Sequence, residues 1–284
     1  MNNTPIQTIP PPISPARTAY LSNQRRHKQL VALTQAALLA AVIFLWEALA
    51  NLGILDSFIM SQPSRIWATL LNMGQNGLHR HALVTCFETL AGFLLGVTLG
   101  NLIAFALWWS AFLSKVLAPY LVVLSALPKV ALGPVIIIWV GAGTSAIIVM
   151  ALAISLIVTT LEMLNGFLST DRELVKMAQT FAASKQQTFF KIVFPSNMHT
   201  LFHSMRVNIG LSLVGVISGE FLVSKAGLGY LIVYGGQVFQ MDLVMTAVMI
   251  LAVVAAVLYQ SVRLLERLVT HRLSHSARSK TPLD

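Results

Sequence analysis

The chain has 284 residues, of which 56% are hydrophobic and only 10% are charged. Soluble domains carry about 25% charged residues, so this composition excludes an ordinary soluble enzyme and a disordered chain and indicates a protein surrounded largely by lipid. The single cysteine, Cys86, excludes an internal disulfide framework and a cysteine-rich metal site.

Residues 1–29 are predicted to be a disordered tail, because the prolines between Pro10 and Pro15 favour extended chain. The apolar run that follows contains Ala48-Leu49-Ala50, which is similar to a signal-peptidase site. However, the run is longer than the roughly 7–15 apolar residues of a signal peptide, and Glu47 precedes the site. We therefore expect this run to be the first membrane helix.

Six segments are long and apolar enough to cross a bilayer, which takes about 20 helical residues. They are residues 30–51, 84–108, 116–140, 145–167, 201–223 and 243–262. None alternates like a barrel strand, so the sequence predicts an all-α polytopic membrane protein with six transmembrane helices over residues 30–268. On the second segment, Gly92, Gly96 and Gly100 recur every four residues, which is typical of close helix–helix packing.

The positive charges lie mostly on one side of this predicted topology. Fourteen of the 19 Lys and Arg residues fall in the two tails or in the connections on their side, and three fall in the opposite loops. This bias predicts that both termini, including the tails 1–29 and 269–284, are cytoplasmic. It also places the net charge of +9 beside the membrane lipid, so nucleic acid is not expected as a partner.

The connection 168–200 is the least hydrophobic stretch between the predicted membrane helices. Thr170 with Glu173, and Ser184 with Gln187, predict two capping boxes. We expect two short helices ending near Phe181 and Phe194, because Pro195 does not continue a helix comfortably. The apolar side chains of this hairpin are Met177, Phe181, Phe189 and Phe190. Periodicity alone leaves open whether it lies on the lipid headgroups or docks a soluble partner.

Ionisable residues within the predicted membrane helices are candidates for function. Glu47, Glu88 and Glu162 lie near helix ends, where we expect interfacial roles. Lys129 follows Pro128 inside an apolar segment, so it could pair with Glu220, line a pore or contact an anionic substrate. Ser218 and Glu220 are the corresponding candidates on the fifth helix. No metal site is expected.

Three sequence blocks, in this order, resemble the permeases of ATP-binding-cassette (ABC) importers. The block from Glu173 to Pro195 is similar to their EAA loop, and two more blocks match the nitrate, sulfonate and taurine subgroup. These two run from Pro128 through Trp139 to Gly143, and from Glu220 through Gly227-Leu-Gly229 to Ile232. The resemblance covers roughly residues 40–268 and implies the fold of a type I ABC importer permease.

The chain departs from the family pattern at several positions. The leading Glu of the motif falls on Lys176, its first Ala on Met177 and its Gly on Ala182. Because glycine there would allow a left-handed backbone, we expect Ala182 either to avoid that conformation or to be slightly strained, by roughly 1 kcal/mol. In addition, Glu88 stands where the subgroup often carries Arg.

The resemblance implies the permease subunit of an ATP-driven importer in the bacterial inner membrane. Its partners would be a cytoplasmic ATP-binding subunit, an extracytoplasmic solute-binding protein and a second permease chain, most simply a homodimer. The chain lacks a Gly-x-x-x-x-Gly-Lys-Ser/Thr loop, so we expect no enzyme activity and no cofactor in it, with ATP bound by the partner. Coupling would run through the 171–195 loop, at Lys176, Met177, Ala178, Phe181, Ala182, Ala183 and Ser184.

The solute would be small, either an anion such as a sulfonate or nitrate or a vitamin- or pyrimidine-like compound. A stand-alone secondary transporter is the alternative function. It would predict two repeats with broken helices in corresponding positions. The proline-broken stretch 128–134 has no convincing counterpart in the sequence.

Overall fold

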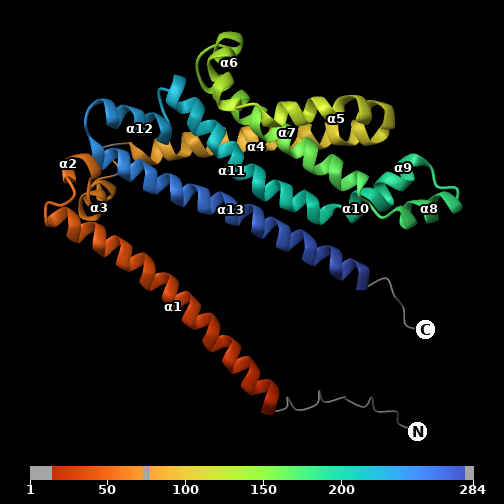
Figure 1. The fold of residues 1–284 in the computed structure, drawn as a ribbon, viewed down its shortest axis with the longest axis horizontal. Helices are drawn as coiled ribbons and strands as arrows, with labels where there is room; N and C mark the ends of the chain where they lie inside the picture. Colours follow the sequence, from red (N-terminus) through yellow and green to blue (C-terminus); the bar gives the residue numbers. More distant parts are fainter. Residues whose placement is uncertain (1–14, 73, 75–76, 279–284) are drawn as a thin grey trace, which may run out of the picture. The chain divides into compact units, whose positions relative to one another are not determined.

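The structure is a computed structural model that describes residues 15–72, 74 and 77–278 (Figure 1). The elements in these residues are helices. They are α1 (Pro15–Asn51), α2 (Ser57–Met60), α3 (Pro63–Leu71), α4 (Leu78–Trp109), α5 (Ala111–Ala126), η1 (Lys129–Leu132), α6 (Gly133–Val140), α7 (Thr144–Leu168), α8 (Arg172–Thr180), α9 (Lys185–Thr188), η2 (Phe189–Val193), α10 (Phe194–Ser196), α11 (Met198–Val223), α12 (Leu228–Gln237) and α13 (Met241–Arg278). The chain divides into two compact units, residues 1–65 and 66–284.

In the first unit, α1 begins at Pro15 and not near residue 30. Residues 15–29 are therefore helical where we expected a disordered tail, and residues 1–14 of that tail lie outside the described residues. Proline is tolerated at the first helical position, and no further proline or glycine interrupts the chain before Leu30, so the helix can start early. Near its other end, the Glu47 carboxylate accepts a hydrogen bond from the Ser64 N–H at 3.0 Å.

Five helices among the described residues are long and apolar enough to cross a membrane, or six if one bent pair counts as a single span. They comprise most of α1, the whole of α4, α7 and α11, and α13 as far as Thr270. Five of the six predicted segments are thus single long helices. Helix α13 continues to Arg278, so residues 269–278 of the predicted C-terminal tail are helical. No proline or glycine occurs between Arg263 and Arg278 to end it sooner.

The third predicted segment, 116–140, is not one helix. Helix α5 ends at Ala126, and the stretch Lys129–Val140 (η1 and α6) leaves it at an angle of 87°. Proline lacks the N–H that a continuing helix requires and disfavours helical backbone in the residue before it. Leu127, which precedes Pro128, is accordingly extended, with φ −65° and ψ 139°.

The centre of the second unit is a layer of three helices, α4, α7 and α11, with α13 beside α4 and α11 (Figure 1). The predicted glycine packing on α4 is confirmed. A Cβ added at Gly92 would lie 2.5 Å from Ala151 Cβ, and one at Gly96 would lie 1.7 Å from Ser155 Oγ. On the other side of α7, a Cβ at Gly215 of α11 would lie 2.7 Å from Ala151 Cα. Helix α7 is therefore held between two seams of close backbone approach.

Helix α12 was not predicted, because residues 228–237 had been assigned to a loop between the fifth and sixth membrane helices. It packs on α13 and on the start of α4, where Leu78, Leu228, Leu231 and Leu243 form a buried cluster. Helices α11 and α13 are also joined by a salt bridge of 3.2 Å between Arg206 and Glu266. The short helices after α7 form the hairpin 171–195 described below.

Candidate functional site

The first arm of the hairpin is α8, which is closed at both ends by local hydrogen bonds. At its start, the Asp171 side chain accepts from the Glu173 N–H at 2.8 Å, so the cap is Asp171 and not Thr170 as predicted. At its end, the Ala182 N–H donates to Gln179 O at 2.9 Å and the Ala183 N–H to Ala178 O at 3.0 Å. This pair of bonds is a Schellman motif.

Ala182 is the residue that turns the chain between the two arms. Its φ is +54°, a left-handed conformation that costs alanine about 1 kcal/mol more than glycine. Of the two outcomes that we expected, the strained one is confirmed. Ala182 thus adopts the left-handed backbone that glycine would adopt at this bend.

The second arm begins with the capping box predicted at Ser184. The Gln187 N–H donates to Ser184 Oγ at 3.2 Å, and Gln187 Oε1 accepts from the Ser184 N–H at 2.8 Å. The helix then widens into a π-helical stretch, η2, and continues through Pro195 in α10. It ends at Ser196, two residues beyond the predicted end near Phe194. Proline is tolerated in the first turn of α10, where its missing N–H is not needed.

Phe189 holds the hairpin to the membrane helices. We expected this residue on the surface, but it is 3% exposed. Its ring lies 4.5 Å from the ring of Phe105, 4.9 Å from Trp108 and 5.2 Å from Phe167, measured between centroids. Phe105 and Trp108 belong to α4 and Phe167 to α7, so one side chain joins the second arm to the ends of two long helices.

Two further contacts attach the hairpin. The Lys185 ammonium donates to Trp109 O and lies 5.7 Å from the ring centroid of Trp108. The Asn197 amide donates at 2.8 Å both to Thr170 Oγ1, before the first arm, and to Val193 O, in the second. The two arms are thus tied to each other and to α4.

The predicted coupling residues divide into exposed and buried positions. Phe181 is 79% and Met177 49% exposed, whereas Ala178 is only 6% exposed. Lys176, Ala182 and Ser184 are exposed, and Ala183 is half-buried. The hairpin therefore exposes Met177 and Phe181, while Phe189 in its second arm packs against α4 and α7.

A second polar site lies at the start of α12. Three successive N–H groups there donate to side chains of other helices: Gly227 to His81 Nδ1 at 2.9 Å, Leu228 to Thr85 Oγ1 at 2.8 Å and Gly229 to Glu220 Oε2 at 2.5 Å. These groups are the otherwise unpaired donors of a helix amino end. A Cβ at Gly227 would lie 2.3 Å from the Glu220 carboxyl, so only glycine permits this approach.

The candidate path residues do not meet in the structure. The Glu220 carboxylate accepts from Thr85 Oγ1 at 2.7 Å as well as from Gly229. The Lys129 ammonium instead donates to Ser125 O at 2.8 Å, a carbonyl in the last turn of α5. The ion pair between Lys129 and Glu220, one of three predicted roles, is therefore not formed. The Ser218 hydroxyl donates to Val214 O at 2.8 Å on its own helix.

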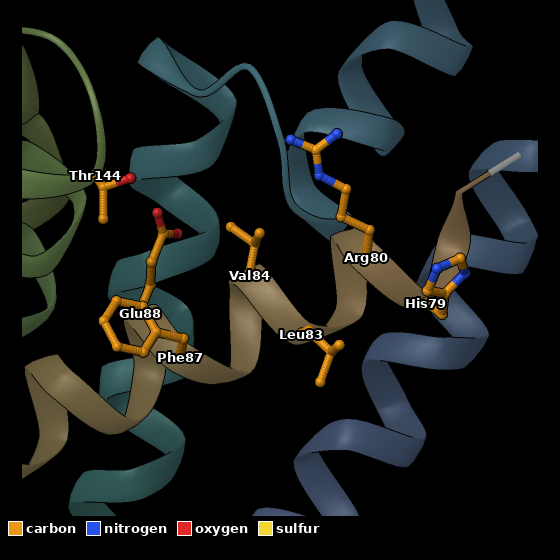
Figure 2. A pocket seen from close by; sticks show the side chains of 7 residues that line it. All are labelled: His79, Arg80, Leu83, Val84, Phe87, Glu88 and Thr144. Carbon is orange, nitrogen blue, oxygen red and sulfur yellow. The ribbon is translucent and has the colours of Figure 1, made fainter.

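Glu88 is buried, and the prediction of an interfacial role was wrong. It is 1% exposed, and neither carboxyl oxygen has a hydrogen-bond partner among the residues that the structure describes. The Thr144 hydroxyl and the Glu220 carboxyl are close enough to interact with it but are not in hydrogen-bonding geometry. Figure 2 shows the carboxyl directed toward Thr144, at the start of α7.

Sequence reasoning missed Thr85 as the partner of Glu220 and His81 as the partner of the Gly227 N–H. Together with Glu88 they recur at spacings of four and three residues, which places them on one face of α4. Such a polar stripe on an apolar helix was a usable signal. The partner helix α12 could not be inferred from it, because the contacts join residues about 140 positions apart in the chain.

Comparison with known proteins gives a consistent result. Residues 92–275 match the family model described as "Binding-protein-dependent transport system inner membrane component". The chain is 30% identical to the riboflavin transport system permease protein of Chloroflexus aurantiacus, over 81% of this chain and 87% of that protein. It is 24% identical to the taurine transport system permease protein of Escherichia coli, over 82% and 86% of the two chains.

Solved structures share the fold. A chain of the methionine ABC transporter MetNI, in an inward-facing conformation, superposes with a TM-score of 0.61 at 17% sequence identity. The match covers 68% of this chain and 95% of that one. An amino acid ABC transporter crystallised with histidines gives a TM-score of 0.54, covering 71% and 97%.

Proposed function

Because the chain belongs to the family of binding-protein-dependent transport system inner membrane components, we propose that its hairpin 171–195 couples transport to a separate ATPase. Family membership makes the chain a multi-pass membrane protein, the non-enzymatic permease subunit of an ABC importer. It also implies an ATP-binding subunit, a substrate-binding protein and the bacterial inner membrane as surroundings.

The anchoring of the hairpin carries this proposal. A docking element transmits force only if it is stiff and firmly attached, since a loose loop would absorb the motion. Both arms are capped, and Phe189 is packed among rings of α4 and α7. Closure of an ATPase dimer around the hairpin would therefore tilt these two helices as a body.

The outward face of the hairpin supports docking to a protein. Phe181 and Met177 form an exposed apolar knob, and Lys176 adds a positive charge beside it. Cavities of about 340 and 330 Å³ lie behind this face, between the hairpin and α4, and both are lined by Trp108, Val175 and Gln179. Large apolar side chains of this kind are typical anchors of protein interfaces, and the charge would select a matching partner surface.

We also propose the topology that the charges predict, with both termini and the hairpin on the cytoplasmic side. Residues 30–268 would form the permease domain, and two copies of the chain would form the pore. The transported solute would be a small organic compound, since relatives carry the names of riboflavin, taurine and formylaminopyrimidine transport systems.

Deletion of residues 176–186 tests the coupling role. The shortened chain should still insert in the membrane, because its apolar helices are intact, but it should no longer co-purify with the ATPase. Co-purification and ATP-driven uptake by the deleted chain would contradict the proposal. Proton-driven uptake by the intact chain alone, without an ATPase, would instead favour a secondary transporter.

A further inference from the structure

Glu88 borders a cavity of about 530 Å³ that the coupling function does not use. Its lining is formed by His79, Arg80, Leu83, Val84, Phe87, Glu88 and Thr144 (Figure 2). This volume is within the range of small-molecule sites, which are mostly apolar with a few polar groups. Leu83, Val84 and Phe87 supply the apolar wall, and Glu88 is its most deeply buried polar group.

The Glu88 carboxyl lacks the donors that a buried carboxyl requires. A polar group that is buried without a hydrogen bond is strongly unfavourable, more so when it is charged. Its neighbour Glu220 also interacts with it, but the Glu220 carboxylate already accepts from Thr85 and Gly229. Thr144 offers one hydroxyl, which is not aligned for a bond. Both Glu88 oxygens therefore lie unpaired just behind the cavity wall, where a shift of the side chain would present them as acceptors to a group from outside the chain.

We propose that Glu88 anchors the transported solute in this cavity and that the solute carries an N–H donor group, neutral or cationic, on a ring-sized apolar body. The inference rests on the proposed function, since it assigns the cavity to the transport path. The carboxyl would accept the donor group at the buried end, and Leu83, Val84 and Phe87 would contact the body. A carboxylate would disfavour a sulfonate or another anion at the same place, because like charges repel.

Arg80 does not convert the cavity into a site for a short zwitterion. It lies eight residues before Glu88 on the same helix, which corresponds to about 12 Å along the axis. The two side chains therefore leave the helix more than two turns apart. Arg80 and His79 are also exposed, whereas Glu88 is buried, so an anion held by Arg80 would stay at the outer end (Figure 2).

Binding of three small probes with similar six-membered rings tests this assignment. The wild-type permease, assembled with its ATPase in lipid nanodiscs, is titrated with 4-aminopyrimidine, benzamidinium and benzenesulfonate. The two donor probes should bind, and benzenesulfonate should bind at least about tenfold more weakly. Glu88→Ala should weaken both donor probes about tenfold or more, whereas Glu88→Gln should weaken benzamidinium more than 4-aminopyrimidine, because only the charge is lost.

Glu162→Gln is the matched control, since it removes a second carboxyl that is partly buried in the membrane region but does not line the cavity. Its probe affinities should equal those of the wild type. The proposal is overturned if neither donor probe binds, if benzenesulfonate binds as tightly as they do, or if Glu88→Gln leaves benzamidinium binding unchanged. Failure of the proposed function would show separately in the same samples, as an ATPase that does not co-purify with the wild-type chain.

Discussion

Replacing Phe189 by alanine should uncouple ATP hydrolysis from transport without preventing docking of the ATPase. The side chain is 3% exposed and touches rings of both α4 and α7. Truncating a buried phenylalanine to alanine lowers the free energy of unfolding by about 3–5 kcal/mol, and each aromatic pair that is lost contributes about 0.5–1.5 kcal/mol. A loss of this size equals a large part of the stability of a typical domain. The second arm should therefore detach locally from the long helices.

Phe181→Ala provides the opposite perturbation on the same hairpin. Phe181 is 79% exposed, so its truncation should change stability by less than about 0.5 kcal/mol. It should, however, weaken the association with the ATPase, because it removes the main apolar side chain of the outward face. The two phenylalanines are eight positions apart and differ chiefly in which side they face.

The assay reconstitutes the importer in proteoliposomes and measures three quantities for each variant. These are the amount of ATPase that co-purifies, the rate of ATP hydrolysis and the rate of solute uptake. Phe189→Ala should retain the ATPase and its hydrolysis but lose uptake, whereas Phe181→Ala should lose co-purification first. Normal uptake by a folded Phe189→Ala variant would refute the reasoning that the hairpin acts as a rigid link.

Three further changes test individual features. Ala182→Gly should relieve the cost of the left-handed backbone, about 1 kcal/mol, and so slow hydrogen exchange of the hairpin amides about fivefold. Unchanged exchange would show that Ala182 is not strained. Gly227→Ala should force the Glu220 carboxyl away and lower the free energy of unfolding by about 1–3 kcal/mol. The control is Gly236→Ala, because a Cβ at Gly236 would have no atom within 4 Å. Equal melting temperatures of the two variants would refute the close approach at Gly227. Asn197→Ala should leave polar groups of the hairpin unpaired, lower the free energy of unfolding by about 1–3 kcal/mol and speed amide hydrogen exchange in both arms. Faster exchange in one arm only would contradict the role of Asn197 in joining them.

Features that depend on neighbouring residues were predictable from the sequence. The Ser184 capping box requires only a hydroxyl and a glutamine three residues later, and both bonds are present. The place of glycine in the family motif identified Ala182 as the bend and left two conformations open, of which the left-handed one is observed. The choice of Asp171 over Thr170 as a cap was not resolved, because both side chains can accept from the first turn of a helix.

Features that depend on tertiary contacts were not predictable. Hydropathy identified 116–140 as one apolar segment, but it does not register how far a proline bends the chain, so the break at Pro128 was underestimated. Phe189 and Phe181 look equivalent in sequence, and only packing against the end of α4 buries one of them. Glu88 was assigned to the interface from its distance along the helix, whereas α7 and α11 cover it.

The packing of the central helices connects the two candidate sites. Phe105 and Trp108, which hold Phe189, lie at one end of α4, and the cavity residue Glu88 lies toward the other. Between them, Gly92, Gly96 and Gly100 bring α4 so close to α7 that the two helices cannot slide past each other without a clash. A tilt applied at the hairpin would therefore be carried to Glu88 and Thr144 together, with little change in the distance between them. The close contact of α11 with α7 at Gly215 and Gly219 adds α11, and with it Glu220, to the same rigid unit. If the hairpin is the proposed lever, access to the cavity would change by motion of this three-helix body against elements outside it, which is a rigid-body mode that a lever at Phe189 could drive.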